Sequence, residues 1–269
     1  MTRVALLVAM AALAGLQVAA AEESALPPAL QDVGFDQKLG DQVPLDLVFR
    51  DETGREVTLG DYFDSRPVVL SLVYYKCPML CTLVLDGLTS SLKALSLVPG
   101  REFEIVTVSF DPRESPELAL AKKEAYLARY GRPEAGEGWH FLTGEEESIR
   151  RLAAAVGFRY AYDPELDQFA HASGILVLTP ESRIARVLFG IEYAPRDLKL
   201  SLVEASQGKI GTLVDQLLLF CFHYDPATGK YGAMVLNLVR AGGAVTVLGG
   251  GLAILGMLRR ERRRGGKDA

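Results

Sequence analysis

Two of the three cysteines in this 269-residue chain stand four positions apart, in the stretch YYKCPMLCTLVLDGL. Cysteine thiolates can attack disulfides, pair with each other or bind a soft metal ion. If Cys77 and Cys81 are both helical, they lie one turn apart on the same face, so both sulfur atoms can point at one place. This geometry suits a disulfide or a shared ion, and the spacing alone does not choose between them.

The surroundings of the pair favour a reactive Cys77. The apolar, β-branched run RPVVLSLVYY at 66–75 predicts a strand buried on both faces, and from Leu80 to Leu95 apolar residues recur every three or four positions, as in a helix. Pro78 fits the first helical position, where its missing N–H costs nothing. Cys77 would then lie at the positive end of a helix, where unpaired N–H groups lower the pKa of a thiol.

Three roles for the cysteine pair remain open on this basis. A structural disulfide closing so short a loop would stabilise the chain only weakly. A thiol-disulfide couple at a strand-to-helix junction is typical of thioredoxin-like redox sites, although those usually have two residues between the cysteines and this chain has three. A metal site would need another nitrogen or sulfur ligand, brought in by the fold.

Histidine can supply that ligand, and the chain has only three. His171, in DQFAHASGILVL, is predicted to lie in a loop directly before an apolar strand. In a thioredoxin-like sheet the loop before that strand runs beside the cysteine motif. Taken alone, a single histidine at the edge of a strand is more often structural or solvated. His140, within the predicted strand WHFLTG, is interpreted as structural.

Strands and helices alternate along the middle of the chain. A turn signal at 51–54 predicts a hairpin between strands at 45–50 and 55–59. Ser115 and Pro116 mark the start of a helix. Further strands are predicted at 103–110, 139–144, 174–180 and 183–190, and helices at 116–130, 145–158 and 195–206. The alternation indicates an α/β domain around a central sheet.

Both ends of the chain predict a membrane location. Residues 1–21 combine one arginine, an apolar run and small residues before the acidic Glu22, which is typical of a signal peptide cleaved near Ala21. Residues 241–258 are uncharged and about long enough to cross a bilayer as a transmembrane helix. The basic tail at 259–269 would stay in the cytoplasm. We therefore expect a C-terminal anchor in the inner membrane, with the soluble domain in the periplasm.

The remaining chain is predicted to form one globular domain at 22–210 and a juxtamembrane segment at 211–240. Residues 22–239 carry a formal charge of -11, because much of the positive charge lies in the C-terminal tail. An exported domain this acidic is a poor candidate for binding nucleic acid. Three cysteines are also too few for a scaffold held together by disulfides.

The order of VVLSLVYYKCPMLC, VSFDPRESPELA, WHFLTG and FAHASGILVLTP resembles the Sco/SenC family of membrane-tethered copper proteins, which help to assemble the binuclear copper centre of cytochrome c oxidase. The resemblance covers about residues 40–205. It implies a thioredoxin-like fold with a central mixed sheet flanked by helices, and one copper ion bound by Cys77, Cys81 and His171. Two soft thiolates favour Cu(I), and with an imidazole the same set can hold Cu(II). Asp111 matches an acidic position near the family's copper site, or is a turn residue before a proline.

The chain departs from the family pattern in two places. The family usually has a proline after the second cysteine, where this chain has Thr82. The family is usually anchored at its N-terminus, whereas this sequence favours a C-terminal span. Thioredoxin-like oxidoreductases, for their part, carry a cis-proline before the strand that faces their cysteines, and FAHASGILVL has no proline. The resemblance therefore points away from a general dithiol oxidoreductase.

The function implied by this resemblance is that of a copper chaperone. Copper held by few ligands would pass, by thiolate ligand exchange, to the copper-binding subunit of cytochrome c oxidase. The alternative is a membrane-tethered thiol-disulfide oxidoreductase in which Cys77 and Cys81 reduce cysteines of that subunit or of another exported protein. Either role needs a thiol reductant, because an exported dithiol does not stay reduced unaided. A sensor signalling through the span is less favoured, because the tail is too short for an output domain.

The third cysteine lies in the segment before the predicted span. Cys221 and His223 would share a face if this segment were a strand, and they could then form a second point for handling copper. The alternative is a buried thiol in an apolar segment. An unchanged copper stoichiometry in a Cys221→Ser variant would rule the second site out.

Overall fold

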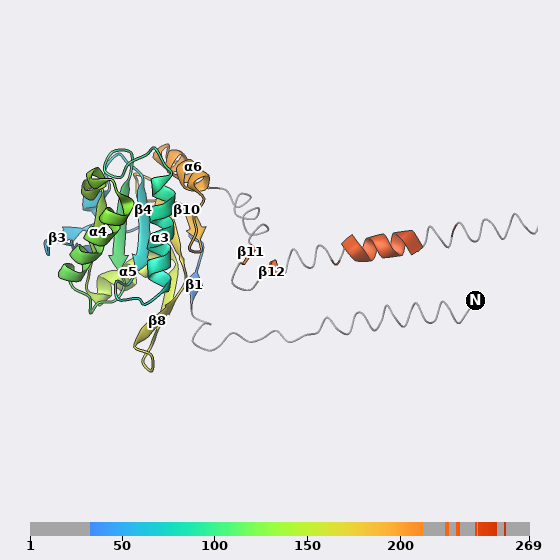
Figure 1. The fold of residues 1–269 in the computed structure, drawn as a ribbon, viewed down its shortest axis with the longest axis horizontal. Helices are drawn as coiled ribbons and strands as arrows, with labels where there is room; N and C mark the ends of the chain where they lie inside the picture. The colour runs from blue at the N-terminus through green and yellow to red at the C-terminus, as the bar shows by residue number, and fades with distance from the viewer. Residues whose placement is uncertain are drawn as a thin grey trace, which may run out of the picture. The chain divides into compact units, whose positions relative to one another are not determined.

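The computed structural model describes residues 33–211, together with 224–225, 230–231, 240, 242–251 and 256. The chain divides into two compact units, Met1–Ile210 and Gly211–Ala269. In the first unit, a mixed β-sheet carries helices packed against it (Figure 1). This is the α/β domain expected from the alternation of strands and helices, and its thioredoxin-like arrangement is the one that the resemblance to the Sco/SenC family implied.

The central sheet has the strand order β10-β9-β4-β5-β6. Its strands are β4 (Val68–Val73), β5 (Glu104–Ser109), β6 (Trp139–Leu142), β9 (Gly174–Leu178) and β10 (Ile184–Phe189). Strands β4, β5 and β6 run parallel, whereas β9 is antiparallel to β4 and β10 is antiparallel to β9. Every residue of β4, β5 and β9 is buried, and β4 and β9 are accordingly almost entirely apolar, whereas β5 also contains the buried polar residues Glu104, Thr107 and Ser109.

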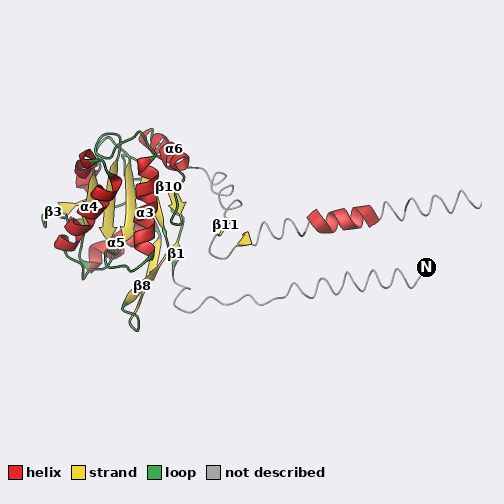
Figure 2. Cartoon of the chain, viewed as in Figure 1, coloured by secondary structure: helices red, strands yellow, loops and turns green. Residues whose placement is uncertain are grey.

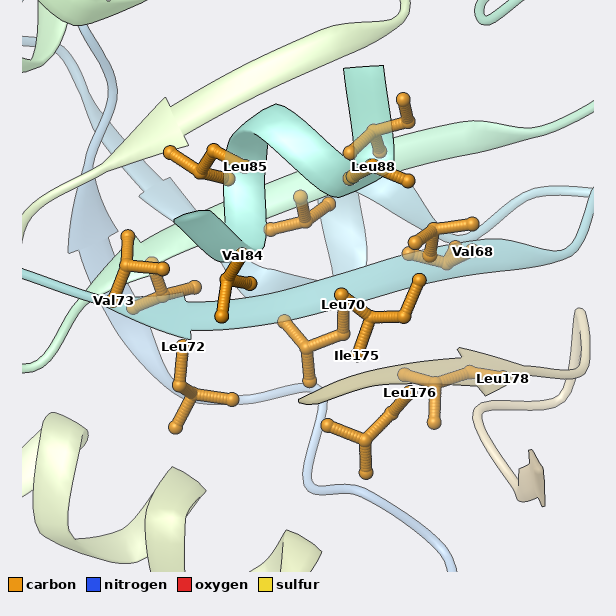
Figure 3. Packing of buried hydrophobic residues seen from close by; sticks show 14 of the residues in the cluster. Val68, Leu70, Leu72, Val73, Val84, Leu85, Leu88, Ile175, Leu176 and Leu178 are labelled. Atoms are coloured by element: carbon orange, nitrogen blue, oxygen red, sulfur yellow. The ribbon is translucent and has the colours of Figure 1, made fainter. Parts of the chain in front are cut away.

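Four helices are packed around these strands. They are α3 (Leu80–Lys93), α4 (Pro116–Tyr130), α5 (Glu146–Val156) and α6 (Pro195–Ser206). Helix α3 contacts α4 and α6, and α4 also contacts β6; in Figure 2, α3 and α4 lie in front of the strands. Val84 and Leu88 of α3 are buried between that helix and β4 (Figure 3). Burying a side chain of this size contributes about 1.5–3 kcal/mol, so this apolar face holds α3 on the sheet.

A second, antiparallel sheet has the order β1-β7-β8 and was not predicted. It consists of β1 (Gly34–Phe35), β7 (Phe158–Asp163) and β8 (Gln168–His171). The hairpin of β7 and β8 projects beyond the central strands (Figure 1). Gly157 connects α5 to β7 with a φ of 72°, a left-handed conformation that glycine adopts without strain. A Cβ atom there would meet the Asp36 carbonyl oxygen at 2.0 Å, so a larger residue would displace β1 or β7.

Most of the other predicted elements are present. The predicted hairpin near the N-terminus is formed by β2 (Val48–Arg50) and β3 (Glu56–Thr58). A short 3-10 helix, η1 (Leu59–Tyr62), follows the hairpin, and another, η2 (Pro133–Glu137), follows α4. Helix α4 has the bounds predicted for it, with Ser115 at the N-cap position, Pro116 in the first turn and Gly131 at the C-cap in a left-handed conformation. The helix after the cysteines begins later than predicted, for a reason given below.

In the second unit the structure describes the short strands β11 (Tyr224–Asp225) and β12 (Lys230–Tyr231), which pair antiparallel, and helical residues at 242–251. None of the described helices is both long and apolar enough to cross a membrane. The predicted span at 241–258 falls partly on residues outside the description and stays a prediction. The predicted signal peptide at 1–21 and the pair Cys221 and His223 lie wholly outside the described residues.

Candidate metal centre

Cys77 and Cys81 lie where the buried strand β4 gives way to α3. The backbone of Met79 has φ -145° and ψ -71°, outside the helical region, so α3 starts at Leu80 and the prediction of Pro78 as its first residue was wrong. Cys81 is therefore in the first turn of the helix and Cys77 precedes it. The two remain adjacent because the Cys81 N–H, which has no partner within the helix, donates to Cys77 Sγ at 3.3 Å.

His171 completes the group from a distant part of the chain. It is the last residue of β8, paired with Tyr160 across the hairpin, so its prediction as a loop residue was wrong. Its Nε2 atom lies 3.1 Å from Cys81 Sγ, a residue 90 positions earlier, and its Nδ1 atom lies 2.8 Å from the carbonyl oxygen of Ala172. The Ala172 contact fixes the ring so that Nε2 faces the sulfur atoms.

Aromatic side chains surround the histidine. The rings of Tyr74 and Phe110 lie edge-on to the His171 ring, with centroids 5.9 Å and 5.3 Å away. The Phe158 ring is tilted relative to the His171 ring, and the two ring centroids are 6.2 Å apart. Such packing leaves His171 only 8% exposed and restricts its rotation. The imidazole is thus presented to the cysteines in one orientation.

The two thiols differ in electrostatic environment. Hydrogen bonds from the Cys81 thiol, from His171 and from the backbone N–H groups of Cys81 and Met79 outweigh burial and lower the pKa of Cys77. Burial, together with the neighbouring negative charge on Cys77, raises the pKa of Cys81 well above its usual value. At neutral pH the pair therefore holds one thiolate, on Cys77, and one thiol, on Cys81.

The three predicted residues share a single location. One donor atom from each of Cys77, Cys81 and His171 lies within 4.8 Å of the others, and this is the only such cluster of three or more Cys, His, Asp or Glu side chains in the described part of the chain. The cysteines are free thiols, 9% and 2% exposed. Two sulfur atoms and one imidazole nitrogen at this spacing fit a soft metal ion such as copper. Metal binding by these residues remains a prediction.

Glu114 belongs to the same region and was not singled out from the sequence. Its carboxylate accepts hydrogen bonds from the backbone N–H groups of Tyr75 and Lys76, in the turn that leads to Cys77, and from the hydroxyl of Ser109. The sequence signal is weak, because a glutamate in PRESPE reads as an ordinary residue before a helix cap. Only the fold shows that this acid is buried beneath the cysteine turn.

Asp111 lies beside the site as a turn residue. It accepts a hydrogen bond from the Arg113 backbone N–H and forms an ion pair with the Arg113 guanidinium group at 2.8 Å. The same guanidinium reaches Asp167 at the tip of the β7–β8 hairpin, at 2.7 Å. Asp111 and Asp167 help to line a groove of about 390 Å³, together with Tyr74, Lys76 and Pro78 from the cysteine turn. The residues on both sides of Cys77, Lys76 and Pro78, therefore line this groove.

His140 has a structural environment, as predicted. Its Nε2 atom lies 3.1 Å from the buried carboxylate of Glu104, and its ring packs on Tyr62 with a centroid separation of 4.4 Å. Arg66 forms an ion pair with Glu104 at 2.7 Å. Glu104 and His140 lie near the amino ends of β5 and β6, whereas the cysteines follow the carboxyl end of β4. His140 is thus committed to a buried polar cluster remote from the cysteines.

Solved structures of other proteins have a fold similar to that of this chain. A structure from Aquifex aeolicus VF5, described as a candidate electron transfer protein, is 26% identical with a TM-score of 0.57, over 64% of this chain and 96% of that one. Another from the same organism, described as a candidate electron transport protein, is 26% identical with a TM-score of 0.53, over 64% and 100%. Arabidopsis thaliana ScoI with copper bound is 18% identical with a TM-score of 0.47, over 64% and 99%.

A search of curated proteins gives no match to the chain. The SCO1/SenC family model matches residues 37–202, which is more than half of the chain and includes Cys77, Cys81 and His171. With its α/β thioredoxin-like domain and its Cys-x3-Cys pair next to a histidine, the chain belongs to the SCO1/SenC family.

Proposed function

We propose that this protein is a copper chaperone that passes copper, by thiolate ligand exchange, to the copper-binding subunit of cytochrome c oxidase. The observation that carries the proposal is the convergence of Cys77, Cys81 and His171 within 4.8 Å. Membership of the SCO1/SenC family supports it, since relatives named ScoI have been observed with copper bound. Two thiolates and an imidazole are soft and borderline donors, which suit Cu(I).

The arrangement of the donors suits transfer of copper rather than permanent storage. Structural metal sites are usually closed by four protein ligands, whereas this one offers three. Cys81 and His171 are supported by the helix and by the hairpin, and Cys77 lies in the turn beside the groove. A thiolate of the client would approach from the groove and replace Cys77 first, and Cys81, which is only 2% exposed, would release copper last.

The proposed place of action is supported by the sequence of the two chain ends. We place the domain in the periplasm, anchored in the inner membrane by residues 241–258, with the basic tail at 259–269 in the cytoplasm. A cytochrome oxidase subunit exposed on the same side of the membrane would then be within reach of the tethered domain.

A thiol-disulfide reductase is the second candidate, and the inequality of the two thiols favours it. In that reaction the Cys77 thiolate attacks a disulfide of the client and forms a mixed disulfide. Cys81 then loses its proton and attacks Cys77, which releases the client as a dithiol and leaves a Cys77–Cys81 disulfide. A thiol reductant would have to restore the pair. A low pKa at Cys77 and a high pKa at Cys81 match an attacking and a resolving sulfur.

Competition for Cu(I) separates the two candidates. We expect the reduced wild-type protein to hold one copper ion against a Cu(I) chelator. We expect His171→Ala to bind about tenfold more weakly, equivalent to about 1.4 kcal/mol. His140→Ala is the control, and it should bind copper as the wild type does because His140 contacts Glu104 and Tyr62 instead.

Failure of the wild type to compete for copper would reject the chaperone. The same preparation, mixed with a disulfide-containing peptide and a thiol reductant, would then be tested for turnover that depends on both cysteines. If His171→Ala binds copper as tightly as the wild type, the two thiolates remain the candidate ligands and His171 is not a ligand.

A further inference from the structure

We infer that Glu114 is a positioning residue that holds the turn carrying Cys77 in the geometry needed for metal binding. This inference rests on the proposed function, because it concerns the same donor group. Glu114 Oε2 accepts from the Tyr75 N–H at 2.6 Å, and Oε1 accepts from the Lys76 N–H at 2.7 Å. One carboxylate thus binds two consecutive backbone N–H groups immediately before Cys77.

Every backbone N–H group from residue 74 to residue 77 is accounted for. The Tyr74 N–H donates to Cys81 Sγ at 3.3 Å, and the Cys77 N–H donates to the Tyr74 carbonyl oxygen at 3.2 Å. The two groups between them have no backbone acceptor and depend on Glu114. Removing the carboxylate would leave both groups without an acceptor, the Tyr75 N–H in a buried place and the Lys76 N–H in a partly buried one, and an unpaired buried N–H group carries a desolvation cost. The turn would rearrange to avoid that cost.

Glu114 is itself held in place. Its side chain accepts a third hydrogen bond, from Ser109 Oγ at 2.6 Å, at the carboxyl end of β5. It is 7% exposed, and no Lys, Arg or His side chain among the described residues forms an ion pair with it. Three donors therefore compensate the burial of the carboxylate, two of them from the cysteine turn.

The side chain of Tyr75 attaches the same turn to the central sheet. Its hydroxyl oxygen lies 2.8 Å from the carbonyl oxygen of Leu142 in β6 and 3.1 Å from that of Thr107 in β5, so its one proton is shared between these two acceptors. Tyr75 is thus attached to the sheet by its phenol and to Glu114 by its backbone. Lys76, whose side chain is exposed, relies on the Glu114 bond alone. The position of Cys77 next to the first turn of α3 follows from these attachments.

Two substitutions of Glu114 distinguish the effect of where its carboxylate oxygens lie from the effect of its charge. Glu114→Gln keeps the length but leaves one acceptor oxygen for two N–H groups, and Glu114→Asp keeps the charge but is too short to reach both. Glu52→Gln is the matched control. Glu52 is also buried and accepts a strand N–H, that of Phe141 at 3.0 Å, but it pairs with Lys123 and makes no hydrogen bond to the cysteine turn.

We would measure Cu(I) affinity, amide hydrogen exchange and thermal unfolding of the full chain for each variant. We expect both Glu114 variants to lose about 10–100-fold in Cu(I) affinity, as for other outer-shell partners of metal ligands, and the amides of Tyr75 and Lys76 to exchange faster. Glu52→Gln should lower the unfolding temperature and keep the wild-type affinity.

The outcomes distinguish this inference from the proposed function. Wild-type affinity in Glu114→Asp or Glu114→Gln would overturn the inference, even if the unfolding temperature fell. An equal loss of affinity in Glu52→Gln would also overturn it, since the effect would then be one of general stability. If the wild type binds no Cu(I), the proposed function fails instead. Should both Glu114 variants fail to fold, Ser109→Ala, which keeps the carboxylate, should show a smaller loss of affinity, and no loss would reject the inference.

Discussion

The two ends of the central sheet each hold a histidine and a buried glutamate, but they use them differently. At the amino end of β5, the Glu104 carboxylate forms an ion pair with the Arg66 guanidinium and lies 3.1 Å from His140 Nε2. At the carboxyl end, Glu114 accepts only from N–H groups and a hydroxyl, and His171 faces sulfur. In the cluster around Glu104 the polar side chains are paired with one another. In the region around Glu114, two sulfur atoms and one imidazole nitrogen remain directed at a common point. The same residue types can thus stabilise a fold or form a site, depending on whether their partners neutralise them.

The largest effect should come from removing a sulfur. Cys81→Ser replaces a soft ligand by a hard one at a position 2% exposed, and we expect Cu(I) affinity to fall by more than the roughly 10–100-fold typical of lost outer-shell partners. Chelator competition measures the loss. The fold should persist, because the serine hydroxyl can still contact the Tyr74 N–H. Retained affinity would mean that copper binds elsewhere, and the contrast between the two ends of the sheet would lose its basis.

A change at the other end should affect stability alone. Glu104→Gln leaves Arg66 without its buried carboxylate, and we expect a loss of about 2 kcal/mol in the free energy of unfolding. This value lies below the cost of breaking a fully buried pair, because the Arg66 side chain is 28% exposed. Denaturant unfolding measures the change, and copper competition should give the wild-type affinity. Weakened copper binding would show that the two ends are coupled through the sheet.

The smallest of the three effects is a pH dependence of copper binding. Burial, followed by the charge of Cys77, raises the pKa of Cys81, so this thiol must lose a proton when it becomes a ligand. Cys77, whose pKa is lowered, is already a thiolate at neutral pH. One proton is therefore released for each ion bound, and Cu(I) affinity should rise about tenfold for each pH unit below the pKa of Cys81. Competition at several pH values with a pH-corrected chelator gives the slope. A slope of zero would show that Cys81 binds no metal, and a slope of two would show that Cys77 starts protonated.

The elements with long apolar runs or clear cap residues could be predicted from the sequence. Helix α4 has a proline in its first turn and a glycine at its C-cap, and β4 and β9 are unbroken apolar stretches. The β7–β8 hairpin was missed because FRYAYDPELDQFAH mixes aromatic and charged residues and is only partly buried. Its stability comes from pairing with β1 and from aromatic contacts such as Phe158 on Phe35, which are tertiary features.

The sequence predicted which residues form the candidate site, but not the contacts that position them. The sequence identified Cys77 and Cys81 by their spacing at a strand-to-helix junction, and the resemblance to the family supplied His171. The opposite pKa shifts of the two thiols come from the hydrogen bonds to Cys77, first of all from the Cys81 thiol, and from the burial of Cys81, and both depend on where the hairpin and α3 meet. Glu114 acts by accepting hydrogen bonds from two backbone N–H groups. Because almost every residue has a backbone N–H group, the sequence gives no indication of which ones a buried carboxylate will bind.

Cys81 and His171 lie 90 positions apart in the chain, on a helix and on a hairpin that pack together only in the folded protein. An ion bound to both would act as a removable cross-link closing a long loop, and it would favour the native state over the unfolded chain. Binding energy would then appear as resistance to unfolding, in proportion to the logarithm of free copper over the dissociation constant. The copper-loaded form would be the more rigid and longer-lived one, and each release of copper would return the protein to a looser state that is more easily cleaved by proteases.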